Sequence, residues 1–370
     1  MRVIILKTNL KDALSCAERV VGESSNLPVL KNVLLKAADG SLTVVATNLE
    51  LGVQRRAIAK VLEPGSITIP FTTFYSIITD ADSERIHLET SEHTLSVKTD
   101  NYQAKIQGLP ESEFPIIPKL GELRASLEIS THTLREALSV VVIAAHVSEI
   151  RPEISGILFD FQMSALKLVA TDSFRLAEKT LHTSEFKATA EAGCRAIVPL
   201  KTVQEVTRIF ARDQQVSVSF DANQVFFKTE DTELISRLID GHYPDYEQII
   251  PKKAITEVTL EREHLMSAVR LVGNFAGRAN DITLRLKDGT ALEAYSSNQH
   301  LGENTYLVPA KVNGGAFSDV SFNWRYLSDG LKAIAAKTII LGVSGDAKPA
   351  VVRSSEDTSY FYLLMPIKAA

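Results

Sequence analysis

Leu10-Lys11-Asp12-Ala13-Leu14 is the stretch that decides the fold, because the chain repeats it twice more. It recurs as Leu134-Arg135-Glu136-Ala137-Leu138 and, more loosely, as Leu265-Met266-Ser267-Ala268-Val269. Further segments recur behind it in the same order: Ala46-Thr47-Asn48 with Ala170-Thr171-Asp172 and Ala294-Tyr295-Ser296, Ile69-Pro70 with Val198-Pro199 and Phe322-Asn323, and Phe114-Pro115 with Tyr243-Pro244. Chance hardly produces four such matches in register. We therefore expect three repeats of about 120 residues, each large enough to be a domain.

Each repeat has the same predicted order of elements: an amphipathic helix, alternating strands, a second helix and further strands. The second helices are expected to begin near Phe71, Leu200 and Trp324. The apolar stripe of the first helix consists of Leu10, Ala13, Leu14, Ala17, Val20 and Val21. Two helices and many strands predict an α+β fold in which each repeat packs both helices on one face of an antiparallel sheet.

Proline-rich segments separate the repeats. Phe114-Pro115-Ile116-Ile117-Pro118 lies near the first boundary, and Ile249-Ile250-Pro251 lies at the second. Clusters of this kind are typical of linkers. We expect three domains, with boundaries 1–119, 120–251 and 252–370.

The composition limits the class of protein. Apolar residues make up 45% of the chain, and 40 Lys and Arg stand against 45 Asp and Glu, for a formal charge of −5. This balance excludes a globally basic nucleic-acid binder but allows a locally basic surface. The short apolar start Met1–Leu6 is followed at once by Lys7 and does not resemble a secretory signal. Cys16 and Cys194 are expected to be buried free thiols in a reducing cytoplasm.

The sequence contains no motif from which an active site could be built. It has neither of the common glycine-rich phosphate loops and no paired histidines or cysteines at zinc-binding spacing, and its eight histidines are scattered. Ser164-Ala165-Leu166-Lys167 fits a Ser-x-x-Lys pattern but lies in an alternating strand without companion motifs. We therefore predict no catalysis, no metal and no cofactor.

Basic residues recur on helix after helix. In the middle repeat, Lys201, Arg208 and Arg212 are spaced so that they share one helical face, apart from the apolar stripe. The other predicted helices carry Lys11, Arg19, Arg262, Arg270, Arg325 and Lys332. For any one helix, an ordinary solvated face is the simpler interpretation. Together these residues predict a basic strip that contacts phosphates without reading bases.

At full length the chain resembles the β subunit of bacterial DNA polymerase III, the sliding clamp family. The segments that carry the resemblance are Leu27-Pro28-Val29-Leu30, Val169-Ala170-Thr171-Asp172 with Arg175-Leu176, Asp240-Gly241 with Tyr243-Pro244-Asp245-Tyr246, Phe322-Asn323 with Tyr326-Leu327, and Leu364-Met365-Pro366. The resemblance implies a head-to-tail homodimer whose six domains form a ring around duplex DNA. Helices would line the lumen, and the protein would act as a processivity factor on the nucleoid, in the cytoplasm.

The resemblance also implies a pocket that binds short peptide segments of the replicative polymerase, the clamp loader and other clamp-binding proteins. Residues that match the family's pocket are Ile154, Gly156, Thr171, Ser173, Phe174, Arg175, Leu176, Pro244, Ile249, Asn323, Tyr326, Pro349, Val351, Leu363, Leu364, Met365, Pro366 and Ile367. Ser173-Phe174 stands where the family often has Gly-His, so the peptide preference is expected to differ. The second helix of the first repeat has no basic residue, so DNA contacts are expected mainly from the second and third repeats.

For the dimer, we expect Ala104 and Ile106 of one chain to meet the region of Phe275 in the other. Two other classes of protein stay open at this point. One is an enzyme on a tandem α/β scaffold, which requires a pocket with converging titratable groups. The other is a monomeric peptide-binding scaffold without DNA, which the oligomeric state would distinguish.

Overall fold

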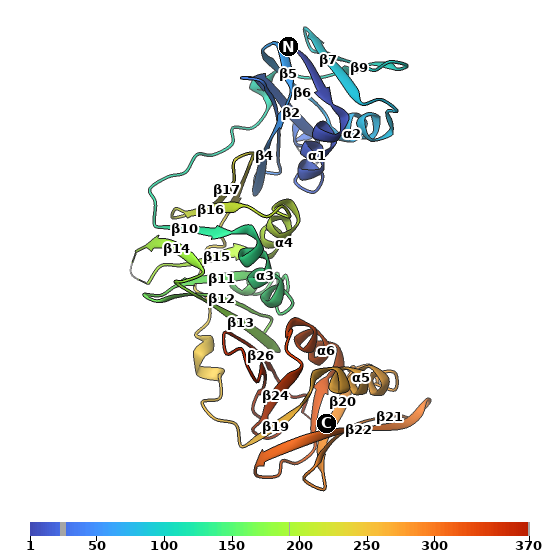
Figure 1. Cartoon of the computed structure of the whole chain (residues 1–370), viewed down its shortest axis with the longest axis vertical. Coiled ribbons are helices and arrows are strands. Elements are labelled where there is room, and N and C mark those ends of the chain that lie inside the picture. The colour runs from blue at the N-terminus through green and yellow to red at the C-terminus, as the bar shows by residue number, and fades with distance from the viewer. Residues whose placement is uncertain (23–26, 192, 369–370) are drawn as a thin grey trace. The chain divides into compact units, whose positions relative to one another are not determined.

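The computed structural model describes residues 1–22, 27–191 and 193–368. The chain divides into two compact units (Figure 1). The N-terminal unit comprises Met1–His132, Lys187–Glu191 and Glu205–Leu238, and the C-terminal unit comprises Thr133–Phe186, Ala192–Gln204 and Ile239–Ala370.

The N-terminal unit contains two antiparallel sheets and two helices of its own. A five-stranded sheet has the order β5 (Lys60–Glu63), β1 (Arg2–Leu6), β7 (Arg85–Ser91), β8 (Thr94–Lys98), β9 (Gln103–Gln107). A nine-stranded sheet has the order β14 (Phe186–Ala190), β10 (Ala125–Ser130), β16 (Gln215–Phe220), β17 (Gln224–Lys228), β18 (Thr232–Arg237), β4 (Leu51–Ile58), β3 (Ser41–Thr47), β2 (Asn32–Ala38), β6 (Gly65–Pro70). The helix α1 (Lys7–Ala17) packs on β3, β4 and the helix α2 (Phe71–Asp80).

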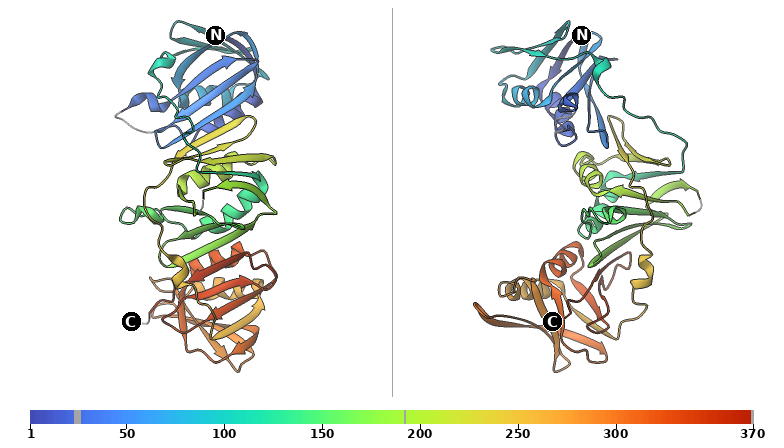
Figure 2. Two further views of the ribbon diagram at one scale, coloured as in Figure 1. Left: turned by 90° about the vertical axis from the view of Figure 1, so that its left-hand side faces the viewer. Right: turned by 180° about the vertical axis from the view of Figure 1, so that it is seen from behind.

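The C-terminal unit is built on one continuous antiparallel sheet of twelve strands. Its order is β15 (Arg195–Pro199), β11 (Gly156–Phe161), β12 (Ala165–Thr171), β13 (Arg175–His182), β26 (Tyr360–Leu364), β25 (Ala350–Ser354), β24 (Thr338–Val343), β19 (Thr256–Glu261), β22 (Gly302–Gly314), β21 (Ala291–Asn298), β20 (Asp281–Lys287), β23 (Val320–Asn323). The helices α5 (Arg262–Gly273) and α6 (Trp324–Ala333) pack together, and α5 covers β21 and β22 (Figure 2). The helices α3 (Thr131–Val142) and α4 (Leu200–Ile209) have residues in both units.

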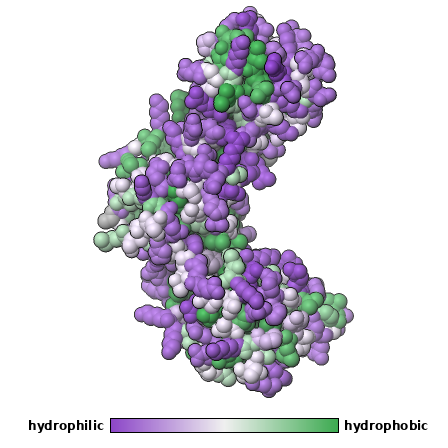
Figure 3. Space-filling model, in the orientation of Figure 1, coloured by the Kyte–Doolittle hydropathy of each residue, from purple (hydrophilic) through white to green (hydrophobic). Residues whose placement is uncertain are grey.

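These elements confirm the α+β repeat and the starts of all three second helices. Leu10, Ala13, Leu14 and Ala17 of the predicted apolar stripe are buried and Val21 is half-buried, but the helix α1 is shorter than expected. It ends at Ala17, and Val20 is buried from the turn that follows it. On the face drawn in Figure 3, hydrophilic residues cover most of the surface and apolar residues form separate patches. No helix within the described ranges is long and apolar enough to cross a membrane.

The turn after β3 and the turn after β12 have the same internal geometry. In each, the threonine hydroxyl donates to the carbonyl oxygen of the residue four positions on, at 3.0 Å from Thr47 and 2.7 Å from Thr171. The third residue of each turn has a positive φ, 76° at Leu49 and 78° at Ser173. Residues other than glycine rarely adopt a positive φ. Its recurrence at matching positions is therefore specific structural evidence for the repeat.

Successive repeats are joined by the same kind of strand pair. In the N-terminal unit β4 pairs with β18, and in the C-terminal unit β13 pairs with β26. The strands at the matching positions in the outer repeats are β22 and β9. Over the described residues, β9 is an edge strand bonded only to β8, and the first part of β22 is bonded only to β21. Each of these two strands therefore presents an open edge.

Candidate functional site

Arg175 begins β13 and is fixed by the turn that precedes it. The Asp172 carboxylate accepts hydrogen bonds from the backbone N–H of Arg175 at 3.0 Å and from its Nε at 2.9 Å. Nη1 donates to Asp329 of α6 at 2.9 Å, and the guanidinium lies 4.1 Å above the ring centroid of Tyr326. These contacts fix the Arg175 side chain between the turn after β12 and the helix α6. The turn and the helix together form one wall of the site.

The start of α6 is itself held close to β26. The Asn323 side chain caps the helix by accepting from the backbone N–H of Arg325 at 3.0 Å. Tyr362 of β26 is fully buried, and its hydroxyl donates to the carbonyl of Tyr326 at 3.0 Å. A Cβ added at Gly330 would lie 2.3 Å from the Tyr362 ring, so only glycine allows this approach. Burial raises the pKa of Tyr362, which keeps its hydroxyl protonated as a donor.

Met365 follows β26 and adds a flexible apolar side chain beside this wall. Its backbone N–H donates to the Phe174 carbonyl at 2.8 Å. Together with Tyr243, Ile250 and Phe361, the half-buried Met365 packs on a buried cluster. That cluster consists of Leu158, Val169, Leu176, Ile197, Tyr246 and Leu363. An apolar surface with an unbranched thioether beside a fixed arginine suits a short peptide with apolar anchors.

The structure thus brings together Thr171, Arg175, Asn323, Tyr326 and Met365, which the resemblance implied. Other residues of that set support the surface from below, because they are buried: Ile154, Leu176, Leu363 and Leu364. Gly156 is also structural, since a Cβ there would lie 2.4 Å from the Val198 carbonyl. Ser173, Phe174 and Ile249 are exposed, and Pro244, Pro349, Val351, Pro366 and Ile367 are half-buried. The sequence reasoning missed Asp329, Tyr362 and Phe361; the continuous apolar run 360–364 was the available signal for the last two.

Arg208 does not share the exposed face of Lys201 and Arg212 that its spacing predicts. Its side chain is only 27% exposed and pairs with the buried Glu205 at 2.6 Å. Its guanidinium donates to the carbonyl oxygens of Ser15 at 2.8 Å and Cys16 at 3.3 Å. The last carbonyls of a helix have no partner within the helix, and α1 obtains one here from α4.

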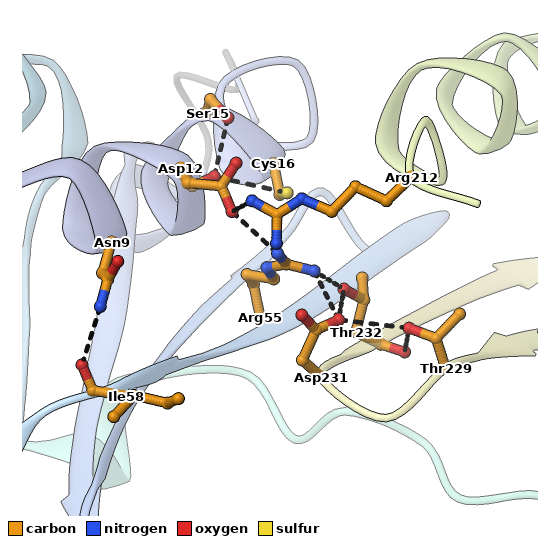
Figure 4. A network of polar contacts seen from close by, with 10 residues as sticks. All are labelled: Asn9, Asp12, Ser15, Cys16, Arg55, Ile58, Arg212, Thr229, Asp231 and Thr232. Carbon is orange, nitrogen blue, oxygen red and sulfur yellow. Dashed lines mark hydrogen bonds and ion pairs between the residues drawn. The ribbon is translucent and has the colours of Figure 1, made fainter. Parts of the chain in front are cut away.

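The neighbouring cations form one network within the N-terminal unit (Figure 4). Buried Arg55 lies between Asp12, at 2.8 Å, and Asp231, at 2.5 Å. Arg212 reaches the same oxygen of Asp12 at 3.1 Å but remains largely exposed. Of the other predicted basic residues, Lys11, Arg19, Lys201, Arg270, Arg325 and Lys332 are exposed, and Arg262 is half-buried.

Of the predicted dimer residues, Ile106 is the one that is buried within its own chain. Its side chain is 6% exposed and belongs to the core of the N-terminal unit. Alternate residues of an edge strand point inward, and Ile106 is one of them. Ala104 and Phe275 are half-buried. The backbone edge of β9 is open, whereas the Ile106 side chain is buried within its own unit.

Comparison with known proteins matches all three repeats to one family. Sequence models of the DNA polymerase III β subunit match residues 1–118 with its N-terminal domain, 128–245 with its central domain and 247–368 with its C-terminal domain. The chain belongs to the DNA polymerase III β subunit family, the bacterial sliding clamps. The chain consists of three tandem clamp domains. Members of this family are processivity factors without catalytic activity.

Relatives of this sliding clamp chain match it end to end. The β sliding clamp of Synechococcus elongatus is 29% identical, with 100% of this chain and 99% of the relative covered. The Bacillus subtilis clamp is 24% identical over the full length of both. A crystal structure of a Pseudomonas aeruginosa clamp bound to griselimycin superposes with a TM-score of 0.94 at 26% identity, covering 100% of both chains.

Within the described residues, no group of His, Cys, Asp or Glu is placed to hold a metal ion.

Proposed function

We propose that two copies of this clamp chain close head to tail into a ring around duplex DNA and tether the polymerase through the surface at Arg175 and Met365. The observation that carries the ring is the repeated strand pair. β4 pairs with β18 and β13 with β26, which leaves the matching strands β22 and β9 open. Pairing β22 of one copy with β9 of the other repeats the same joint, and six domains turned by about 60° each close a circle.

The domain boundaries proposed for this ring are 1–119, 120–251 and 252–370.

The open edges contain exposed polar residues beside apolar ones. Leu271, 51% exposed, is held beside β22 because Asn304 donates to its carbonyl at 3.0 Å. An exposed leucine next to an unpaired strand is what a strand-addition interface covers.

DNA would be held by exposed cations of the helices, chiefly Lys201, Arg270, Arg325 and Lys332, and by Arg212, which lies just after the end of α4 at Ile209. Contacts to phosphates alone give binding that is independent of sequence and falls steeply with salt. In this proposal topology, and not affinity, retains the ring on DNA. The replicative polymerase and the clamp loader would dock at the apolar surface, and the protein would work in the cytoplasm on the nucleoid.

One experiment tests the ring. The purified chain is loaded onto nicked circular DNA with a clamp loader, and retention is measured by gel filtration before and after the circle is linearised. We expect retention on the circle and loss from the linear form. Equal retention on both forms would contradict encirclement. Sedimentation of the free protein provides the second reading, with a dimer expected and a monomer favouring the peptide scaffold without DNA.

A further inference from the structure

A basic cavity lies in the C-terminal unit, next to the apolar surface. Its volume is about 280 Å³, and it is bounded by the segment between the single turn Tyr246–Ile249 and β19 (gold in Figure 1) and by β24 and β25. Three cations line it, Lys252, Lys253 and Arg353, against one carboxylate, Glu257. The whole chain carries a formal charge of −5, so this cavity departs locally from the general balance.

The carboxylate does not neutralise the cavity. Glu257 is paired with Arg353 at 2.7 Å. Lys252 and Lys253 are exposed, and in the described part of the chain neither has a carboxylate within ion-pair distance. Two ammonium groups therefore remain available to an acidic ligand.

The cavity continues the apolar surface along one row of residues. Leu176 pairs with Leu363, Leu363 with Val351, and Val351 with Gly342, so all four positions lie on the same face of the sheet. At Gly342 the row has no side chain, and a Cβ there would lie 3.0 Å from the Cβ of Ala254. The three strand steps from Leu176 to Gly342 span about 14 Å. An extended peptide covers that distance with about four residues.

We propose that this cavity is an acidic-residue subsite of the partner-binding surface. The inference rests on the proposed function. A partner segment whose apolar anchors fill the surface at Met365 would continue across Val351 and place an aspartate or glutamate, about four residues beyond the anchors, against Lys252 and Lys253. Partners with acidic flanks would then be preferred over partners with the same anchors and neutral flanks.

The test uses fluorescent clamp-binding peptides from a bacterial replicative polymerase with the full-length protein. One peptide carries three acidic residues after a short spacer at its N-terminal end, one carries them at its C-terminal end, and two matched peptides carry serines instead. Dissociation constants are measured by anisotropy at low and high salt. We expect one acidic peptide to bind about three- to ten-fold more tightly than its serine match at low salt, with the gain lost at high salt.

Two variants locate the gain. The double variant Lys252→Gln, Lys253→Gln should abolish the low-salt gain in affinity of the acidic peptide. It should leave the affinity for the serine peptides unchanged. Lys311→Gln with Lys337→Gln removes the same charge from exposed positions outside the cavity and should keep it. Equal affinity of acidic and serine peptides for the wild type, or equal loss in both variants, would overturn the subsite alone. Failure of every peptide to bind would overturn the proposed peptide function itself, and the subsite with it.

Discussion

Arg208 donates a hydrogen bond from Nη1 to the carbonyl oxygen of Ser15 at 2.8 Å, across 193 positions of the chain. The contact places an arginine of the second repeat on the last turn of the first repeat's helix α1, where a cation is favoured by the helix dipole. The sequence spacing of Arg208 predicts a DNA contact, but its side chain instead connects α4 to the end of α1.

Replacement of Arg208 by alanine should lower the free energy of unfolding by about 1–3 kcal/mol, because two carbonyls lose their donor and the buried Glu205 loses its partner. Urea unfolding of the free protein measures it. Lys201→Ala, on the same helix but exposed, is the control and should change stability by less than about 0.5 kcal/mol. An equal loss of unfolding free energy in the two variants would contradict a stabilising role of Arg208.

Arg55→Ala should destabilise the N-terminal unit more strongly, by about 3 kcal/mol, because the substitution leaves Asp12 and Asp231 facing each other without the buried cation. The neighbouring Arg56 is exposed, and Arg56→Ala is the matched control with the same change of charge. Thermal unfolding distinguishes them. A wild-type melting temperature for Arg55→Ala would show that the network in Figure 4 contributes nothing to stability.

Leu271→Asp should weaken the proposed dimer by at least ten-fold, since a charge would be placed at a partly exposed apolar position beside the open edge of β22. The monomer should fold normally, and the far-UV circular dichroism checks this. Ile150→Asp, at another exposed aliphatic residue, should leave the dimer intact. Ile106→Asp is expected instead to unfold the N-terminal unit. Sedimentation equilibrium gives the dissociation constants, and an unchanged value for Leu271→Asp would exclude this placement of the interface.

Met365→Ala should reduce the affinity for a clamp-binding peptide by about ten-fold, because a few buried contacts carry most of the energy of such sites. The fold should not change, since Met365 is half-buried at the end of β26. The control is Met163→Ala, at a fully exposed methionine. Isothermal calorimetry with the same peptide compares the two variants, and similar affinities would place the site elsewhere.

Burial raises the pKa of the Glu178 carboxyl, against the opposing charge of Lys167. The folded state then holds this proton more tightly than the unfolded state. The contribution of Glu178 to stability therefore falls as the pH rises from the usual glutamate pKa of about 4.3 through the raised folded-state pKa, and is constant above it.

Glu178→Gln removes this dependence. Relative to the wild type, the variant should gain stability between about pH 4 and about pH 8, as followed by urea midpoints. Glu149→Gln, at an exposed glutamate of the same unit, should show no such gain. A stability difference between Glu178→Gln and the wild type that is the same at both pH values would contradict the shift.

The sequence by itself determined the three repeats and the starts of their second helices, and its short motifs predicted several of the residues that lie together around Arg175 and Met365. These depend on local periodicity and on short motifs, such as Leu10–Leu14 and Thr171–Leu176, that keep their meaning wherever the chain places them. Only the tertiary structure decided what Arg208, Ile106 and Gly342 do. Arg208 meets the end of α1, Ile106 points into its own core, and Gly342 opens a cavity beside Lys252. Each outcome depends on groups brought together from distant parts of the chain, and no periodicity within one segment records which distant group will lie opposite it.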